Sequence, residues 1–89
     1  MKIEVLGAGC KNCEDLYANV RKAVEIAGLG DRAEVTKVSD VKYFFKLGVL
    51  VTPALVVDGK VLSSARLLAP EEICNLFRQN GINAEETAG

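Results

Sequence analysis

The alternation of apolar and polar residues divides the chain into short strands and amphipathic helices. Residues 2–6 are predicted to form a strand, and residues 33–38 alternate in the way of a strand near a sheet edge. Between them, apolar residues recur every three or four positions and predict a helix with one buried face: Leu16, Tyr17, Val20, Ala23, Val24 and Ala27. Strand, helix and strand in this order make a βαβ unit, so the two strands should run parallel.

A second, shorter helix is predicted over residues 41–47, where Asp40 can cap its first turn. Three consecutive aromatic residues make this helix apolar nearly all round: Tyr43, Phe44 and Phe45. We therefore expect the helix to pack against the sheet.

A hairpin is predicted after this helix. Residues 54–57 form a continuous apolar run, which is typical of a strand buried on both faces. Asp58 and Gly59 are the residues that a two-residue type I′ turn requires, and residues 60–63 follow as the second arm of the hairpin.

The last predicted element is a helix that opens with Pro70 and ends at Asn80 and Gly81. The element order is then βαβαββα. We expect a single domain over residues 1–81, followed by a polar tail, residues 82–89, that is frayed.

The composition of the chain excludes several classes of function. A chain of 89 residues with a net charge of −1 has neither the basic surface of a nucleic-acid-binding protein nor a polybasic membrane patch. No apolar run approaches the length of a membrane span, and the amino-terminal residues do not resemble a signal peptide. We expect a soluble, cytoplasmic monomer that binds neither nucleic acid nor membrane.

The chemistry of the chain centres on Cys10 and Cys13, two thiols separated by two residues just before the first helix. Unpaired N–H groups and the helix dipole favour negative charge at a helix start, so a thiol there ionises more readily than a free one. A disulfide closing so small a loop stabilises a fold by only about 2 kcal/mol. The two cysteines are therefore better suited to a reactive role than to stabilising the fold as a disulfide. Cys74, in the last helix, is expected to be a small core residue.

Two motifs together resemble the thioredoxin superfamily: the CxxC at the start of the first helix and Thr52-Pro53 before the hairpin. Over residues 2–79 the chain is most similar to the small, glutaredoxin-sized thioredoxin-like proteins known as redox-active disulfide proteins. This resemblance implies a thioredoxin-like α/β fold, with a four-stranded mixed sheet of order 2-1-3-4 flanked by three helices. It also implies that the last two strands run antiparallel to the first two.

The resemblance further implies a thiol–disulfide oxidoreductase that needs no cofactor and reduces or exchanges protein disulfides. Cys10 would be the attacking thiolate and Cys13 the resolving thiol. Pro53 would be cis and lie against the two cysteines, while the Thr52 backbone would pair with an extended substrate segment. The implied partners are disulfide-containing proteins and a thioredoxin-reductase-like enzyme that recycles the protein.

Three other residues are expected to modulate this chemistry. Lys11 and Asn12 lie between the cysteines in place of the family's more familiar Gly-Pro or Pro-Tyr. The reduction potential of family members therefore cannot be assigned to this protein. Lys11 would either stabilise the thiolate or be a solvated surface lysine. Glu4 lies six residues before Cys10, where thioredoxins carry a buried acid. It would be either a proton acceptor or a half-exposed strand residue.

The main alternative is a module that binds copper(I) or a similar soft metal through the same two cysteines. Ferredoxin-like domains of that kind carry methionine two residues before the first cysteine, where this chain has Ala8. They also run βαββαβ and end in a strand, whereas this chain is predicted to end in a helix. A structural zinc site lacks ligands, and a redox-inert interaction module is hard to reconcile with two retained cysteines. We therefore expect no metal site.

Overall fold

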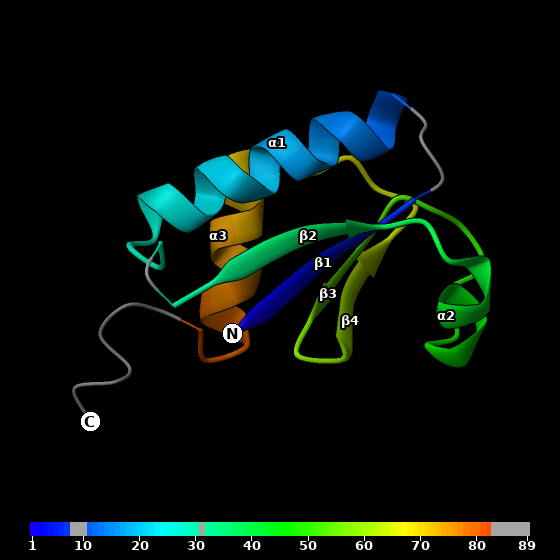
Figure 1. Ribbon diagram of the computed structural model, residues 1–89. Coiled ribbons are helices and arrows are strands. Elements are labelled where there is room, and N and C mark those ends of the chain that lie inside the picture. Colours follow the sequence, from blue (N-terminus) through cyan, green and yellow to red (C-terminus); the bar gives the residue numbers. More distant parts are fainter. Residues whose placement is uncertain (8–10, 31, 83–89) are drawn as a thin grey trace.

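The structure is a computed structural model that describes residues 1–7, 11–30 and 32–82 (Figure 1). The order βαβαββα predicted from the sequence is confirmed, with bounds close to those expected. The elements are β1 (Lys2–Leu6), α1 (Lys11–Ile26), β2 (Glu34–Val38), α2 (Val41–Lys46), β3 (Ala54–Val57), β4 (Lys60–Ser64) and α3 (Pro70–Gln79). Residues 83–89, which make up most of the predicted tail, lie outside the described residues.

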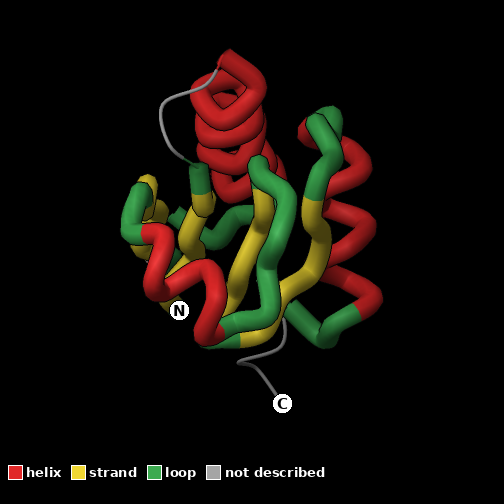
Figure 2. Tube along the Cα trace, turned by 90° about the vertical axis from the view of Figure 1, so that its right-hand side faces the viewer, coloured by secondary structure: helices red, strands yellow, loops and turns green. Residues whose placement is uncertain are grey.

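The four strands form one mixed sheet of order β2-β1-β3-β4, as the resemblance implies. β1 pairs parallel with β2 and antiparallel with β3, and β4 pairs antiparallel with β3. β4 therefore runs in the direction of β1, which corrects the expectation that both later strands oppose the first two. Figure 2 shows α1 and α3 grouped on one side of the sheet and α2 apart from them. No helix in the described part of the chain is long and apolar enough to span a membrane.

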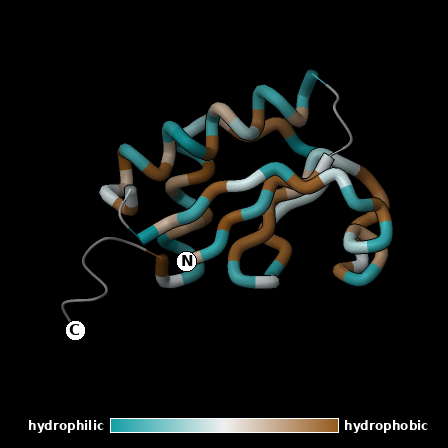
Figure 3. Tube along the Cα trace, in the orientation of Figure 1, coloured by the Kyte–Doolittle hydropathy of each residue, from teal (hydrophilic) through white to brown (hydrophobic). Residues whose placement is uncertain are grey.

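The larger core lies between the sheet and the helices α1 and α3. Alternate residues of the central strands β1 and β3 point into it and pack against the apolar residues of both helices. Figure 3 shows hydrophobic positions recurring along these strands and helices. Its largest fully buried members include Ile3, Val5, Leu16, Val20, Leu55, Ile73 and Phe77. Full burial of one such side chain stabilises the fold by about 1.5–3 kcal/mol, so this core fixes α1 to the sheet.

A smaller core lies under α2 on the other face of the sheet. Its buried members are Leu6, Phe44, Val49, Ala54 and Val56. The expectation that this helix packs against the sheet is confirmed, but Phe45 is 64% exposed, so not all of its aromatic residues take part in the packing. A helix of six residues presents only one side to the sheet, and that side is occupied by Phe44.

The hairpin between β3 and β4 turns at Asp58 and Gly59, whose φ angles of 49° and 84° are both positive, as a type I′ turn requires. Beyond the turn the register shifts. Val56 pairs with Val61, but Leu55 pairs with Ser63, so Leu62 is an extra residue in β4. This β-bulge was not predicted, because apolar alternation alone does not reveal an inserted residue.

Candidate active site

Cys13 lies in the first turn of α1, which begins at Lys11, and its side chain is buried with 4% exposure. It is disulfide-bonded in the structure. Cys10, the predicted attacking thiol, falls in the stretch 8–10 outside the described residues. The geometry of the site is therefore built from Cys13 and the strand ends around it.

Gly7, at the end of β1, provides the space that the Cys13 side chain occupies. A Cβ atom built on Gly7 would overlap the Cys13 Sγ and lie 2.7 Å from its Cβ. The Gly7 N–H donates to the Val38 carbonyl at 2.9 Å, which ties the end of β1 to the end of β2. Gly7 was not singled out from the sequence; a glycine at a strand end just before a CxxC is the signal that would have identified it.

The Thr52–Pro53 peptide bond is cis, the isomer that the resemblance implies. Pro53 is buried and Thr52 is half-buried. The Pro53 carbonyl accepts a hydrogen bond from the Ala65 N–H at 2.8 Å, which extends the hairpin pairing past β4. In the antiparallel register of β1 and β3, Leu6 pairs with Ala54. Gly7 follows Leu6 and Pro53 precedes Ala54, so continuing the same register brings Gly7 beside Pro53.

Glu4 is buried with 5% exposure, so it is not the half-exposed strand residue that was one of the two expectations. Its Oε1 accepts a hydrogen bond of 2.6 Å from the Tyr43 hydroxyl of α2. This bond, together with desolvation and the negative charge of Glu4, raises the pKa of Tyr43. Because Ile3 and Val5 face α1, Glu4 between them points to the opposite face of the sheet.

The two residues between the cysteines are both exposed. Lys11 has an 86% exposed side chain, and its Nζ lies 3.7 Å from Asp15 Oδ2, one helical turn along. An exposed pair of this kind contributes little to stability. This is the geometry of a solvated surface lysine, one of the two interpretations of Lys11.

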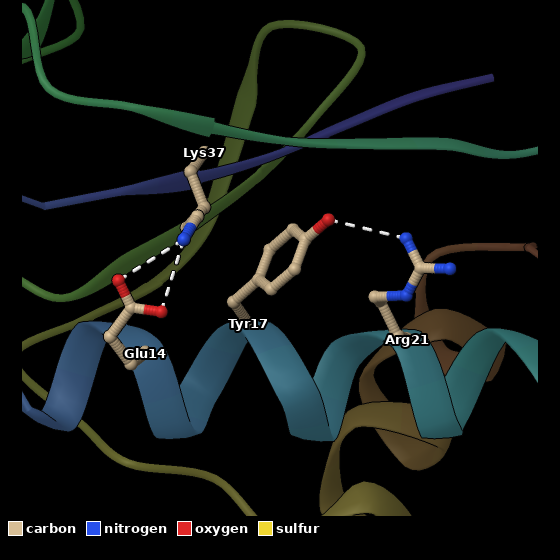
Figure 4. A network of polar contacts seen from close by, with 4 residues as sticks. All are labelled: Glu14, Tyr17, Arg21 and Lys37. Atoms are coloured by element: carbon tan, nitrogen blue, oxygen red, sulfur yellow. Dashed lines mark hydrogen bonds and ion pairs between the residues drawn. The ribbon is translucent and has the colours of Figure 1, made fainter.

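A network of polar contacts joins the first half of α1 to the edge strand β2 (Figure 4). Lys37 Nζ lies 3.1 Å from Oε1 and 3.0 Å from Oε2 of Glu14, the residue after Cys13, and 5.1 Å from the centre of the Tyr17 ring. Arg21 donates to the Tyr17 hydroxyl at 3.2 Å. This network was not predicted from the sequence, because Lys37 is 23 residues from Glu14.

Cys74 is a free, buried thiol with 8% exposure, as predicted for a small core residue. Its Sγ lies 3.5 Å from the Ala23 carbonyl, across the contact between α3 and α1. Burial raises the pKa of this thiol, with a further rise from Glu71 and an opposing effect from Arg78. Within the described ranges, no three His, Cys, Asp or Glu side chains are grouped as a metal site would require.

Comparisons with known proteins agree with this architecture. Residues 1–78 match the family model for a thioredoxin domain. A thioredoxin from Methanothermobacter thermautotrophicus is 37% identical over 73 residues, which cover 82% of this chain and 92% of the relative. A thioredoxin from Methanocaldococcus jannaschii is 38% identical over 71 residues, covering 80% of this chain and 79% of the relative. The chain therefore belongs to the thioredoxin family and is a thioredoxin-like redox protein.

Proposed function

We propose that the protein is a thiol–disulfide oxidoreductase that reduces or exchanges disulfides in other proteins through Cys10 and Cys13. The observation that carries this proposal is the position of Cys13: buried in the first turn of α1, against Gly7 and at the strand end that carries Pro53. Two relatives named thioredoxin support it.

The proposed reaction has two exchange steps. The Cys10 thiolate attacks one sulfur of the substrate disulfide, the substrate S–S bond breaks, and the departing substrate thiolate takes up a proton. Cys13 then loses its proton and attacks the Cys10 sulfur of the mixed disulfide. The second substrate thiol leaves, a disulfide joins Cys10 to Cys13, and two electrons have passed from the protein to the substrate.

The division of roles between the two cysteines follows from their positions. Cys10 directly precedes Lys11, the first residue of α1, where the helix start favours a thiolate. Cys13 is buried, so an external disulfide reaches it less readily than it would an exposed thiol. We therefore assign attack to Cys10 and resolution of the mixed disulfide to Cys13.

Other residues are proposed to assist. The Thr52 backbone, just before Pro53, would pair with an extended substrate segment. Glu4 and Lys11 would act through their charges rather than by contact, since Glu4 faces α2 and Lys11 extends into solvent. We propose disulfide-containing proteins as substrates, a thioredoxin-reductase-like enzyme as recycling partner, and the cytoplasm as the location.

Trapping the mixed disulfide tests the assignment. Cys13→Ser should accumulate a covalent complex with a peptide disulfide, detected by mass spectrometry without reductant, and Cys10→Ser should not. Cys74→Ala is the matched control, because it removes the remaining cysteine and should leave turnover intact. A complex trapped by Cys10→Ser instead would reverse the two roles.

A redox titration separates the proposal from the soft-metal alternative. With glutathione and dithiothreitol buffers, the protein should show a reversible two-electron couple between about −270 and −120 mV. The titration is repeated with copper(I). Tight equimolar copper binding in the absence of such a couple would favour the metal-binding function.

A further inference from the structure

Exposed apolar side chains are concentrated in one short segment. In the described part of the chain, seven large apolar side chains are exposed, and four of them fall within residues 41–51. These are Val41 at 51%, Phe45 at 64%, Leu50 at 81% and Val51 at 56%. Large apolar groups gathered in this way are typical of an interaction surface rather than of scattered surface residues.

Two lysines border the apolar residues of α2. Lys42 and Lys46 are both exposed, and neither forms an ion pair with any described residue. Helical spacing places Val41 and Phe45 on one side of α2 and Lys42 with Lys46 on the adjoining side. The neighbouring acid, Asp40, is the N-cap and accepts a hydrogen bond from the Lys42 backbone N–H at 3.0 Å.

This segment lies at the end of the sheet where the candidate active site lies. The Val49 N–H donates to the Phe44 carbonyl at 2.9 Å, which folds the loop after α2 back against the helix. The chain then passes through Leu50 and Val51 directly into Thr52 and Pro53. In Figure 1, α2 lies at the end of the sheet that carries the carboxyl end of β1.

We propose that Val41, Phe45, Leu50 and Val51, together with Lys42 and Lys46, form a docking surface for substrate proteins. We call these six residues the α2 docking surface. The partner that fits is a protein with an exposed apolar side chain bordered by acidic residues, close in its chain to the disulfide. This inference rests on the proposed oxidoreductase function and specifies its substrate class.

The charge pattern selects this partner by its rate of association. Opposite charges at the rim of an interface increase the association rate, and like charges decrease it. The effect weakens with salt, because the Debye length is about 8 Å at 0.15 M ionic strength and about 3 Å at 1 M. Substrate preference by charge should therefore be clear at low salt and nearly absent at high salt.

The test is single-turnover reduction of two synthetic peptides by the reduced full-length protein. Both peptides carry the same internal disulfide and a leucine beside it, flanked by two glutamates in one peptide and by two lysines in the other. At low salt, the second-order rate constant should be at least about tenfold higher for the acidic peptide. Lys42→Glu combined with Lys46→Glu should reverse that preference, whereas the matched pair Lys2→Glu and Lys22→Glu, also exposed, should retain it.

The apolar part of the surface is tested separately. Phe45→Ser should slow reduction of both peptides by about tenfold and leave reduction of the small uncharged hydroxyethyl disulfide unchanged. Ile26→Ser is the matched control, because Ile26 is 63% exposed but lies at the far end of α1. Equal rates for both peptides with the wild-type protein would overturn the inference.

The failure of the docking surface and the failure of the oxidoreductase are distinguishable. If hydroxyethyl disulfide is reduced but neither peptide charge nor Phe45 matters, only the docking surface is wrong. If the wild-type protein reduces neither the peptides nor hydroxyethyl disulfide, the oxidoreductase proposal itself fails. Phe45-dependent binding to phosphatidylserine vesicles, without a charge preference among peptides, would reassign the surface to a membrane.

Discussion

Gly7 and Cys13 are in direct contact, and the contact exists because Gly7 has no side chain. Any Cβ at position 7 would occupy the same space as the Cys13 sulfur. The φ angle of Gly7 is not in the left-handed region, so its backbone conformation is open to other residues. The requirement for glycine is therefore steric and comes from the cysteine six residues later.

Gly7→Ala should destabilise the oxidised protein by about 1–3 kcal/mol, because the added methyl group forces Cys13 or the end of β1 to move. Urea unfolding of the oxidised protein measures the change. Gly30→Ala is the control: apart from its own chain neighbours, no described residue has an atom within 4 Å of the point where its Cβ would stand, and its φ is not positive either. Equal stabilities for the two variants would show that the Gly7–Cys13 contact does not restrict which residue position 7 can hold.

Tyr43→Phe should destabilise the protein by about 2 kcal/mol at neutral pH, because the buried Glu4 carboxylate loses its hydrogen-bond donor. Tyr17→Phe is the matched control. Among the described residues its hydroxyl accepts one hydrogen bond, from Arg21, and that bond is exposed, so the cost should be below about 0.5 kcal/mol. Chemical denaturation of the three proteins compares these values, and similar losses for both variants would contradict the role given to Tyr43.

The Tyr43 contribution should also depend on pH. The pKa of Tyr43 is raised in the folded protein, so its neutral form is favoured there relative to the unfolded chain. Its contribution to stability is complete below the ordinary tyrosine pKa of about 10 and is lost as pH rises through the folded value. The stability difference between wild type and Tyr43→Phe should therefore shrink above about pH 10. A constant difference up to about pH 11 would count against this linkage.

Cys74 should resist alkylation in the folded protein, since it is buried and its pKa is raised. With the oxidised protein at about pH 8, iodoacetamide should modify Cys74 at least about a hundredfold more slowly than a cysteine introduced by Ile26→Cys on the surface. In guanidinium chloride the two rates should become equal. Rapid native alkylation of Cys74 would mean that α3 opens readily from α1.

The Glu14–Lys37 pair should contribute less than about 1 kcal/mol to stability, because both side chains are about half exposed at 55% and 49%. A double-mutant cycle with Glu14→Gln and Lys37→Met measures the coupling. The coupling should fall further in about 1 M salt. A coupling that stays above about 1 kcal/mol in salt would point to a role for the Tyr17 ring, which Lys37 also contacts.

Local sequence was sufficient to predict the order of the elements. The apolar run of β3, the turn at Asp58 and Gly59, and the helix opening at Pro70 are each determined by neighbouring residues. These elements could be predicted because turn geometry and helix starts depend on only a few consecutive positions.

The contacts between distant residues could not be predicted in this way. Tyr43 is 39 residues from Glu4, and no local pattern indicates which side chain will satisfy a buried carboxylate. The exposure of Phe45 was missed because an aromatic residue on a short helix looks the same in sequence whether it faces the sheet or solvent. The sequence therefore named Cys10, Cys13 and Pro53 as candidate site residues, but it did not single out Gly7, whose contact with Cys13 appears only in the structure.

The sheet separates two cores, and this separation makes the chain modular. α1, which carries Cys13, packs into the core on one face, whereas Phe44 anchors α2 in the core on the other. Substitutions on the outer side of α2 and substitutions along α1 share no buried neighbours, so their effects on folding should add. Substitutions on the proposed α2 docking surface should therefore change substrate preference without disturbing the packing that holds α1 and Cys13 in place.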